Sequence, residues 1–373
     1  MTAPSDALQY ITVLSPLSEV VARLDALVSP VAAQDTVLDA AIGAVLATDI
    51  IASSDMPQHA SALSDGWALA SEQILDASSY APAIVTPAPQ WVDAGQQMPA
   101  GADVVLPFDA LAVMQAHAEV FASAAHGEGV FPARGDVEKG IILRGAGERL
   151  RQMDVAILRA LKLETVSIRA PRVKIVALSA KEPNADFISP VIANAVRANG
   201  GIPEILSAST LEAALSDSHY DAVITIGGTG SGRNDKTVKS LLQLGKLEFH
   251  GFGVSPGQTA ALGSINGRPV LMLPGRLEAA LAVFLVVGRK MMVRLTNARE
   301  SEVGQQVSLL RKIASTIGLT EVVFVRRNSN GIEPLGSGLF SLRALMQADG
   351  WVLVPAESEG ASAGTVVEMR KLP

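Results

Sequence analysis

The sequence predicts a multi-domain α/β protein whose central domain is a parallel sheet with helices on both faces. Apolar strands alternate with helical segments between residues 171 and 298, which is the order of a parallel sheet. Short apolar segments separated by turn residues precede this region, and strands without long helices follow it. The 373 residues are also too many for one ordinary core and indicate about two to four domains.

The N-terminal part is predicted to carry an insertion. Apolar residues at helical spacing predict a helix over residues 17–27, and a second short helix is expected over residues 39–46. Residues 55–68 contain a proline, small residues and Asp65-Gly66, which indicate an irregular loop. We expect residues 1–50 and 130–170 to form one N-terminal domain and residues 51–129 an inserted β-rich domain.

The central domain, residues 171–298, places its loops at one edge of the predicted sheet. Strands are predicted over residues 173–178, 202–206 and 223–226, and helices over residues 188–198, 211–215 and 236–244. Ligands of such sheets bind beyond the carboxyl ends of the strands, where we expect the loops 179–183, 227–235 and 273–275. Asn266-Gly267 predicts a hairpin turn, and residues 299–373 predict a small β domain.

Composition and charge exclude several classes of function. Apolar residues make up 49% and charged residues 18%, as in a folded globular protein. A net charge of −7 without any run of Lys or Arg argues against nucleic acid as a partner. The chain has no cysteine and its first residues lack the form of a signal peptide, so we expect a cytoplasmic protein. The apolar run 277–287 is shorter than the ~20 residues that cross a bilayer, and it predicts a buried helix and no membrane partner.

The strongest chemical signal is the loop at residues 227–235. Gly227, Gly228, Gly230 and Gly232 permit positive φ and close backbone approach, so successive N–H groups can point into one concavity and hold an anion. The N-terminus of the following helix adds positive potential, which suits a phosphate. The spacing fits neither a Walker loop nor a GxGxxG motif. An alternative is that Asp235 only caps the helix and the glycines only tighten the turn.

Six segments, taken in order, resemble a known family. They are DMPQHASALSDGWA (55–68), PAGADVVLPFD (99–109), RGDVEKG with GERL (134–150), GGTGSGRND (227–235), SPG with LPG (255–257 and 273–275), and LGSGLFSLRALMQADGWVLVP (335–355). Over nearly its whole length the chain resembles the molybdopterin molybdenumtransferase family, the MoeA proteins and the gephyrin C-terminal region. The resemblance implies a molybdopterin-binding sheet domain, an elongated N-terminal domain (residues 1–50 and 130–170) with an inserted β domain, and a small C-terminal β-barrel-like domain.

The resemblance also implies a function in molybdenum cofactor biosynthesis. Such a protein binds adenylated molybdopterin and promotes insertion of molybdate with release of AMP, assisted by magnesium. Members act as elongated homodimers, in which the loop with the Asp-Gly-aromatic motif of one chain faces the glycine-rich loop of the other. A molybdoenzyme that receives the finished cofactor is a further implied partner.

Site residues follow from the same resemblance, position by position. Asp65, Glu182 and Asp235 match family acids and are expected to be catalytic, and Asp65, Asp235 and Asp136 are expected metal ligands. For Asp65 the alternative is an Asp-Gly turn without a chemical role. Cofactor contacts are expected from three loops, through Gly227, Gly228, Thr229, Gly230, Ser231, Gly232, Ser255, Pro256, Gly257, Pro274, Gly275 and Arg276.

The chain departs from the family pattern where the chemistry is expected. Ala94 stands in place of a threonine, and Ser255 and Gln258 stand where lysines would meet phosphate and molybdate. Because hydrogen bonds to charged groups are roughly twice as strong as neutral ones, we expect weakened metal insertion unless Lys181, Arg233 or Arg276 compensates. Two alternatives therefore stay open: a non-catalytic carrier that passes the cofactor to a molybdoenzyme, and a sheet domain that binds another nucleotide. The histidines show no zinc-site spacing.

Overall fold

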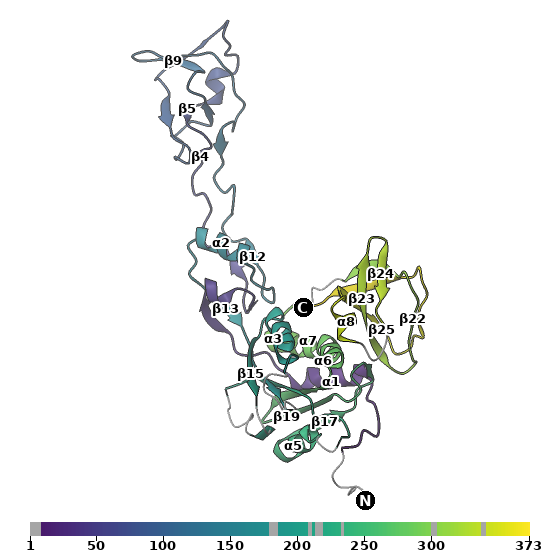
Figure 1. The fold of residues 1–373 in the computed structure, drawn as a ribbon. Coiled ribbons are helices and arrows are strands. Elements are labelled where there is room, and N and C mark those ends of the chain that lie inside the picture. Colours follow the sequence, from purple (N-terminus) through teal and green to yellow (C-terminus); the bar gives the residue numbers. More distant parts are fainter. Residues whose placement is uncertain are drawn as a thin grey trace, which may run out of the picture. The chain divides into compact units, whose positions relative to one another are not determined.

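The chain folds into two compact units in a computed structural model that describes residues 9–178, 186–207, 211–212, 219–232, 235–299, 304–336 and 341–373. Unit 1 comprises residues 1–48, 146–159 and 163–373, and unit 2 comprises residues 49–145 and 160–162 (Figure 1). The four-domain division of the chain stays a prediction.

Unit 2 consists mainly of short strands. Two three-stranded sheets, β7-β5-β8 and β6-β10-β9, lie beside the pairs β11-β4 and β12-β3. The elements are β3 (Ile50–Ile51), β4 (Ser61–Ala62), β5 (Gly66–Leu69), a 3₁₀ turn (Ser71–Ile74), β6 (Ala83–Val85), β7 (Gln90–Val92), β8 (Val104–Leu106), β9 (Leu111–Val113), β10 (Ala118–Val120), β11 (Val130–Phe131) and β12 (Ile142–Arg144).

The prediction of an irregular loop over residues 55–68 is wrong in part, because β4 and the start of β5 lie there. Gly66 makes the pairing of β5 with β8 possible. A Cβ at this position would lie 2.2 Å from the carbonyl oxygen of Leu106, so only glycine allows the two strands to approach this closely.

The N-terminal part of unit 1 is a three-stranded sheet in the order β1-β13-β2. Its elements are α1 (Leu17–Leu27), β1 (Gln34–Val37), a 3₁₀ turn (Leu38–Ala41), β2 (Val45–Leu46), α2 (Gln152–Ala160) and β13 (Thr165–Arg169). The helix predicted over residues 39–46 is wrong. Gly43 has a φ of +82°, which ends the single helical turn, and Val45 and Leu46 then pair with β13.

The central sheet of unit 1 has six strands in the order β15-β14-β16-β20-β19-β17. The first four are parallel, and β19 and β17 continue the sheet antiparallel. The bounds are β14 (Arg172–Ala177), α3 (Ser189–Ala198), β15 (Ile202–Ser207), β16 (Ala222–Ile226), α5 (Thr237–Leu244), β17 (Lys246–His250), β18 (Val254–Ser255), β19 (Ala261–Ile265), β20 (Arg268–Leu273), α6 (Leu277–Val283), a π turn (Phe284–Gly288) and α7 (Arg289–Thr296).

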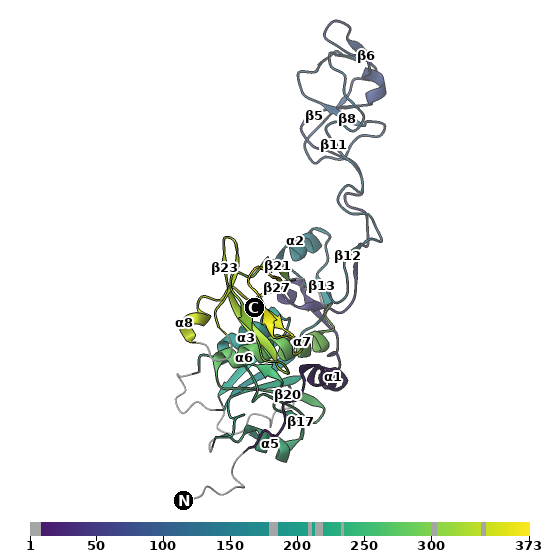
Figure 2. The same cartoon turned by 90° about the vertical axis from the view of Figure 1, so that its right-hand side faces the viewer.

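Helices cover both faces of this sheet, which confirms the predicted fold class. On one face the side chains of α1, α3, α6 and α7 form a core with Ile175, Ile224 and Leu271. On the other face Val238 and Leu241 of α5 pack on Val223 and Val270. Figure 2 shows α5 below β20 and β17, and α3, α6 and α7 above them. The helix predicted over residues 211–215 lies mostly outside the described residues.

Two local predictions within this sheet domain are borne out. Asn266 and Gly267 both have positive φ, at +50° and +78°, and join β19 to β20 as a tight hairpin. Residues 277–287 are helical and buried, although the helix continues to Thr296. The first two charged residues after the apolar run, Arg289 and Lys290, are half-buried and remain helical.

The C-terminal part of unit 1 is a barrel-like sheet. Strand β23 pairs with β24 on one side and β25 on the other, followed by β27 and β21, and Leu309 next to β21 bridges to Ile332 of β24. The elements are β21 (Gln305–Ser308), β22 (Ile313–Ala314), β23 (Thr320–Asn328), β24 (Gly331–Pro334), α8 (Leu342–Leu345), β25 (Gly350–Val354), β26 (Gly360–Ala361) and β27 (Val366–Lys371). Among the described residues, no helix has the length and apolar character to span a bilayer.

The barrel and the central domain are joined by strand pairing. Strand β18 leaves the central domain and pairs in parallel with β23, so that Val254 lies opposite Thr320 and Ser255 lies opposite Glu321. Phe324 and Trp351 of the barrel belong to the same core as α6 and the π turn. The position of the loop after β18 therefore depends on both parts.

We predict that Glu248→Gln lowers the free energy of unfolding by about 1–3 kcal/mol at pH 7. Glu248 accepts two hydrogen bonds from Arg23, at 2.7 and 2.8 Å, and this pair ties α1 to β17. These bonds, aided by Lys246, hold the pKa of Glu248 below its usual range although burial opposes them. The carboxylate therefore stabilises the fold above the ordinary glutamate pKa of about 4.3, and the stabilisation is lost as pH falls through its lower folded value.

Denaturant unfolding between pH 3 and pH 7 measures this difference. The gap between the unmodified chain and Glu248→Gln is expected to be constant above about pH 5 and to shrink below about pH 4. Glu357→Gln, at an exposed loop position, is the matched control and is expected to change stability by less than about 0.5 kcal/mol. If Glu248→Gln also changes the free energy of unfolding by less than about 0.5 kcal/mol at pH 7, the stabilising role of the Arg23–Glu248 pair is contradicted.

Candidate functional site

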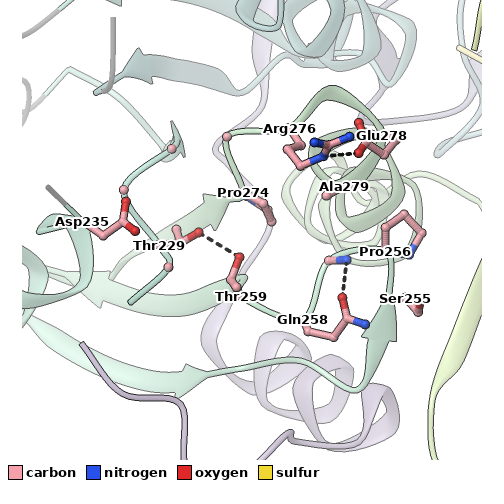
Figure 3. A pocket seen from close by; sticks show the side chains of 15 residues that line it. Thr229, Asp235, Ser255, Pro256, Gln258, Thr259, Pro274, Arg276, Glu278 and Ala279 are labelled. Atoms are coloured by element: carbon pink, nitrogen blue, oxygen red, sulfur yellow. Dashed lines mark hydrogen bonds and ion pairs between the residues drawn. The ribbon is translucent and has the colours of Figure 1, made fainter. Parts of the chain in front are cut away.

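Three loops at the carboxyl edge of the central sheet enclose a cavity of about 460 Å³ (Figure 3). The first follows β16, the second follows β18 and the third follows β20. The lining residues are Gly227, Gly228, Thr229, Gly230, Asp235, Ser255, Pro256, Gly257, Gln258, Thr259, Pro274, Gly275, Arg276, Glu278 and Ala279. The loop that carries the glycines, the SPG segment and the LPG segment therefore meet in one place.

The carbonyl oxygens of the glycine loop are bound from outside the cavity. Thr237 Oγ1 donates to Gly227 O at 3.0 Å, and the backbone N–H of Thr237 donates to Gly228 O at 3.1 Å. His250 Nε2 lies 3.0 Å from Thr229 O and donates to it, because a carbonyl oxygen only accepts. The side-chain amide of Gln9 donates to the carbonyl oxygens of Gly228 and Gly230, at 3.1 and 2.9 Å. None of these three donors, Gln9, Thr237 and His250, lines the cavity.

Four N–H groups of the same loop, unlike its carbonyl oxygens, are left without a partner in the described part of the chain. Within the described part of the chain, the backbone N–H groups of the four residues from Gly228 to Ser231 have no protein acceptor. The N–H and C=O of a trans peptide point in opposite directions, so carbonyls held from outside turn the N–H groups of Gly228, Thr229 and Gly230, which line the cavity, toward it. Thr229 is buried, and buried N–H groups are almost always paired in folded proteins. The loop is therefore a preformed cradle for an anion.

Glycine is required at the start of this cradle. Gly227 and Gly228 have φ values of +88° and +70°, in the left-handed region that other residues avoid. A Cβ on Gly228 would also lie 2.2 Å from Thr237 Oγ1, whose hydroxyl holds Gly227 O. A side chain at this position would break the contact between the loop and α5.

Asp235 closes the loop and lines the cavity. The backbone N–H of Gly232 donates to its Oδ2 at 2.9 Å, and a Cβ on Gly230 or Gly232 would approach this oxygen to within 2.8 or 2.9 Å. The alternative that Asp235 only caps the following helix is wrong, because α5 begins at Thr237 and its N-cap, Lys236, makes no side-chain cap. The carboxylate braces the loop, and its remaining oxygen is available for a ligand or a cation.

The second loop faces the cradle with neutral polar groups. The hydroxyls of Thr259 and Thr229 lie 3.2 Å apart, and Gln258 Oε1 accepts the N–H of Gly257 at 3.2 Å. Ser255 is buried and is held by the pairing of β18 with β23. The residues that replace the expected lysines are therefore in the cavity wall, and they present an amide and a hydroxyl.

The charges on the cavity wall sum to a negative value among the described lining residues. Arg276 Nε forms an ion pair with Glu278, whose side chain is 3% exposed, and Asp235 adds a second carboxylate. In the view of Figure 3, Asp235 lies at the left of the cavity and the Arg276–Glu278 pair at the upper right. A phosphate dianion is repelled by such a wall unless a cation accompanies it. Over the described residues, no group of three His, Asp or Glu side chains could hold a metal ion unaided.

The other predicted site residues lie elsewhere. Asp65 and Asp136 belong to unit 2, and both are exposed. Asp65 Oδ1 accepts the backbone N–H of Ala94 at 2.7 Å, which ties the Asp-Gly loop to the turn where the family threonine would stand. Glu182, Lys181 and Arg233 lie outside the described residues. Ser231 and Gly232 belong to the loop but do not line the cavity.

Five polar or charged residues that line or hold the site were not singled out from the sequence. They are Gln9, Thr237, His250, Thr259 and Glu278. A hydroxyl residue at the start of the helix was a signal that could have indicated Thr237, because such residues favour helix starts. No local pattern indicates Gln9 or His250, which reach the loop from 219 and 21 residues away.

Three family models match the chain in succession. The MoeA N-terminal region (domain I and II) matches residues 15–161, a probable molybdopterin binding domain matches residues 189–293, and the MoeA C-terminal region (domain IV) matches residues 306–372. A relative from Methanocaldococcus jannaschii that is named for molybdopterin biosynthesis is 24% identical. The match covers 88% of this chain and 89% of that protein.

Solved structures show the same fold. Two crystal structures of the molybdopterin biosynthesis MoeA protein of Pyrococcus horikoshii align with TM-scores of 0.78 and 0.76, at 24% and 22% identity. They cover 97% and 96% of this chain and 100% and 99% of their own. A molybdenum cofactor biosynthesis protein of Pyrococcus furiosus aligns with a TM-score of 0.63 at 20% identity, over 96% of this chain and 99% of its own.

We predict that Gly228→Ala abolishes binding of inorganic phosphate to the cavity. The substitution adds the left-handed backbone cost of about 1–2 kcal/mol and drives a methyl group into Thr237. Gly267→Ala is the matched control, because Gly267 has a similar φ of +78° but nothing within 4 Å of an added Cβ. Calorimetric titration should show unchanged phosphate affinity for Gly267→Ala. Equal affinities for both variants would contradict the cradle.

Proposed function

The chain belongs to the MoeA family, and from this premise we propose that it inserts molybdate into molybdopterin, with adenylated molybdopterin as substrate and AMP as product. The family acts in molybdenum cofactor biosynthesis. The observation that carries the proposal is the set of N–H groups of Gly228, Thr229 and Gly230, which line the cavity and have no protein acceptor in the described structure. A phosphate of the pterin is the anion that we assign to them.

The residues of the cavity divide the chemistry between them. Release of AMP breaks one phosphorus–oxygen bond of the adenylate, and a water molecule supplies the oxygen that replaces it. The cradle N–H groups stabilise the negative charge on the phosphoryl oxygens, as oriented donors do in other acyl and phosphoryl transfers. Asp235 accepts the N–H of Gly232 with one oxygen and directs its charge at the cavity.

A magnesium ion fits this wall. Magnesium is commonly bound by one or two carboxylates together with substrate phosphates and waters, so a single protein carboxylate at the cavity is sufficient. We assign Asp235 as that ligand, and the excess negative charge of the described wall favours a cation there. The ion would supply positive charge beside the phosphate oxygens.

The remaining predicted roles stay part of this proposal. Asp65 and Glu182 are proposed catalytic acids, and Asp136 a further metal ligand, on the resemblance alone. We also propose a cytoplasmic homodimer and a molybdoenzyme as recipient of the cofactor. The matched models favour a biosynthetic enzyme over the carrier alternative.

We predict that purified chain releases AMP from adenylated molybdopterin in the presence of magnesium and molybdate, and that Asp235→Asn slows release about 10- to 100-fold. The asparagine oxygen can still accept the N–H of Gly232, so the loop is braced while the charge is lost. AMP is quantified by chromatography, with molybdopterin binding followed in parallel.

Asp221→Asn is the matched control for this experiment. Asp221 lies at the opposite end of β16 and also accepts a backbone N–H, that of Arg172, at 2.7 Å. Its substitution should leave AMP release within about twofold of the unmodified chain. Cofactor binding without any AMP release by the unmodified chain would contradict the transferase proposal.

A second prediction concerns the missing lysine. Gln258→Lys should tighten binding of inorganic phosphate about 3- to 10-fold at low salt, because a charge-assisted hydrogen bond replaces a neutral one. The gain should shrink as ionic strength rises. Gln243→Lys, which adds the same charge at an exposed position of α5, is the control and should change the affinity little. A gain of the same size in both variants would show a general charge effect instead.

A further inference from the structure

Gln9 is buried and reaches the glycine loop from a segment that precedes α1. Its side chain is part of a residue only 5% exposed, and both of its amide hydrogens are used, on the carbonyl oxygens of Gly228 and Gly230. Its Oε1 accepts the backbone N–H of Lys239 in the first turn of α5, at 3.0 Å. One side chain therefore joins the loop to the helix that follows it.

The orientation of this amide is fixed by its partners. Two carbonyl oxygens only accept and one backbone N–H only donates, so the reversed amide would place its oxygen against both carbonyls. Replacing this buried amide would cost stability, because each hydrogen bond that is lost leaves a buried polar group without a partner.

The contact sets the direction of two peptides of the cradle. The carbonyl of Gly228 shares its peptide with the N–H of Thr229, and the carbonyl of Gly230 shares its peptide with the N–H of Ser231. Holding Gly228 O on the outer side turns the N–H of Thr229, which lines the cavity, inward, and holding Gly230 O fixes the direction of the next peptide but one. His250 does the same for the intervening peptide through Thr229 O.

The segment that carries Gln9 is itself anchored. Ser15 exchanges backbone hydrogen bonds with Gly251 and Gly253, at 2.9 and 2.7 Å. Gly251 has a φ of +98°, and a Cβ there would lie 2.5 Å from Ile11, so the segment packs directly on the chain that follows His250. The match to the MoeA N-terminal region begins at residue 15, so Gln9 lies before the residues of that match.

We propose that Gln9 is a positioning residue for phosphate binding, which holds the N–H group of Thr229 toward the ligand and fixes the peptide that follows Gly230. The inference rests on the proposed function only in taking a phosphate as the ligand of the cradle. Gln9 itself touches no ligand and acts through the carbonyls of Gly228 and Gly230.

Three variants of the full chain test this assignment by titration with inorganic phosphate. Gln9→Glu keeps the size of the side chain and the acceptor for Lys239 but places an oxygen against the two carbonyls. Gln9→Asn keeps the amide but is one methylene shorter, so it reaches fewer of the three partners. Gln243→Glu adds the same charge at an exposed position of α5 and is the matched control.

The expected order of phosphate affinity is unmodified chain, then Gln9→Asn, then Gln9→Glu, with a loss of about 10- to 100-fold for Gln9→Glu. Gln243→Glu should stay within about twofold. In turnover assays the KM for adenylated molybdopterin should rise for Gln9→Glu by a similar factor, with a smaller change in kcat. Circular dichroism and thermal unfolding of each variant separate loss of binding from loss of fold.

Other outcomes would overturn the assignment. A folded Gln9→Glu that binds phosphate as tightly as Gln243→Glu overturns the role of Gln9 and leaves the proposed function standing. If Gln9→Glu does not fold, Gln9→Asn decides, and unmodified affinity in that variant overturns the role. An unmodified chain that binds neither phosphate nor adenylated molybdopterin overturns both the role and the proposed function.

Discussion

The site depends on the polarity of one short stretch of backbone. The carbonyl oxygens from Gly227 to Gly230 are bound by Thr237, Gln9 and His250, and the N–H groups of the same peptides have no acceptor among the described residues. Because a peptide cannot turn both of its polar groups the same way, fixing one side presents the other. Position 228 requires glycine, because its φ is +70° and an added Cβ would collide with Thr237. The cradle is thus built by contacts that lie outside the cavity.

Segments distant in the sequence supply those contacts. α1 is tied to β17 through Arg23 and Glu248, and β17 ends at His250, which holds the loop. The wall opposite the cradle follows β18, which pairs with β23 of the C-terminal barrel. A wall with two carboxylates and one ion-paired arginine among its described residues suits a ligand that brings its own cation, and it accounts for the proposed use of magnesium. The neutral side chains of Ser255 and Gln258 add no positive charge to this wall, so under the proposal the cation would have to supply it.

Much of the fold and part of the site could be predicted from the sequence. The alternation of strands and helices gave the sheet and its edge, and the glycines of residues 227–232 indicated the cradle, because these signals are local. Gln9 and His250 could not be found in this way, since their partners are set by tertiary packing and no spacing connects them to the loop. Asp235 satisfied the pattern of a helix cap, yet it bonds Gly232 because the glycine loop folds back onto it. The predicted helix over residues 39–46 failed where Gly43 turns the chain into a strand pairing.

The most direct measurement is a crystal structure of the unmodified chain soaked with inorganic phosphate. The account predicts phosphate oxygens within about 2.7–3.2 Å of the backbone nitrogens of Thr229 and Gly230, with Gln9 still bonded to the carbonyls behind them. Phosphate bound in the cavity at Arg276 and away from these nitrogens, or a cavity without phosphate at saturating concentration, would contradict it.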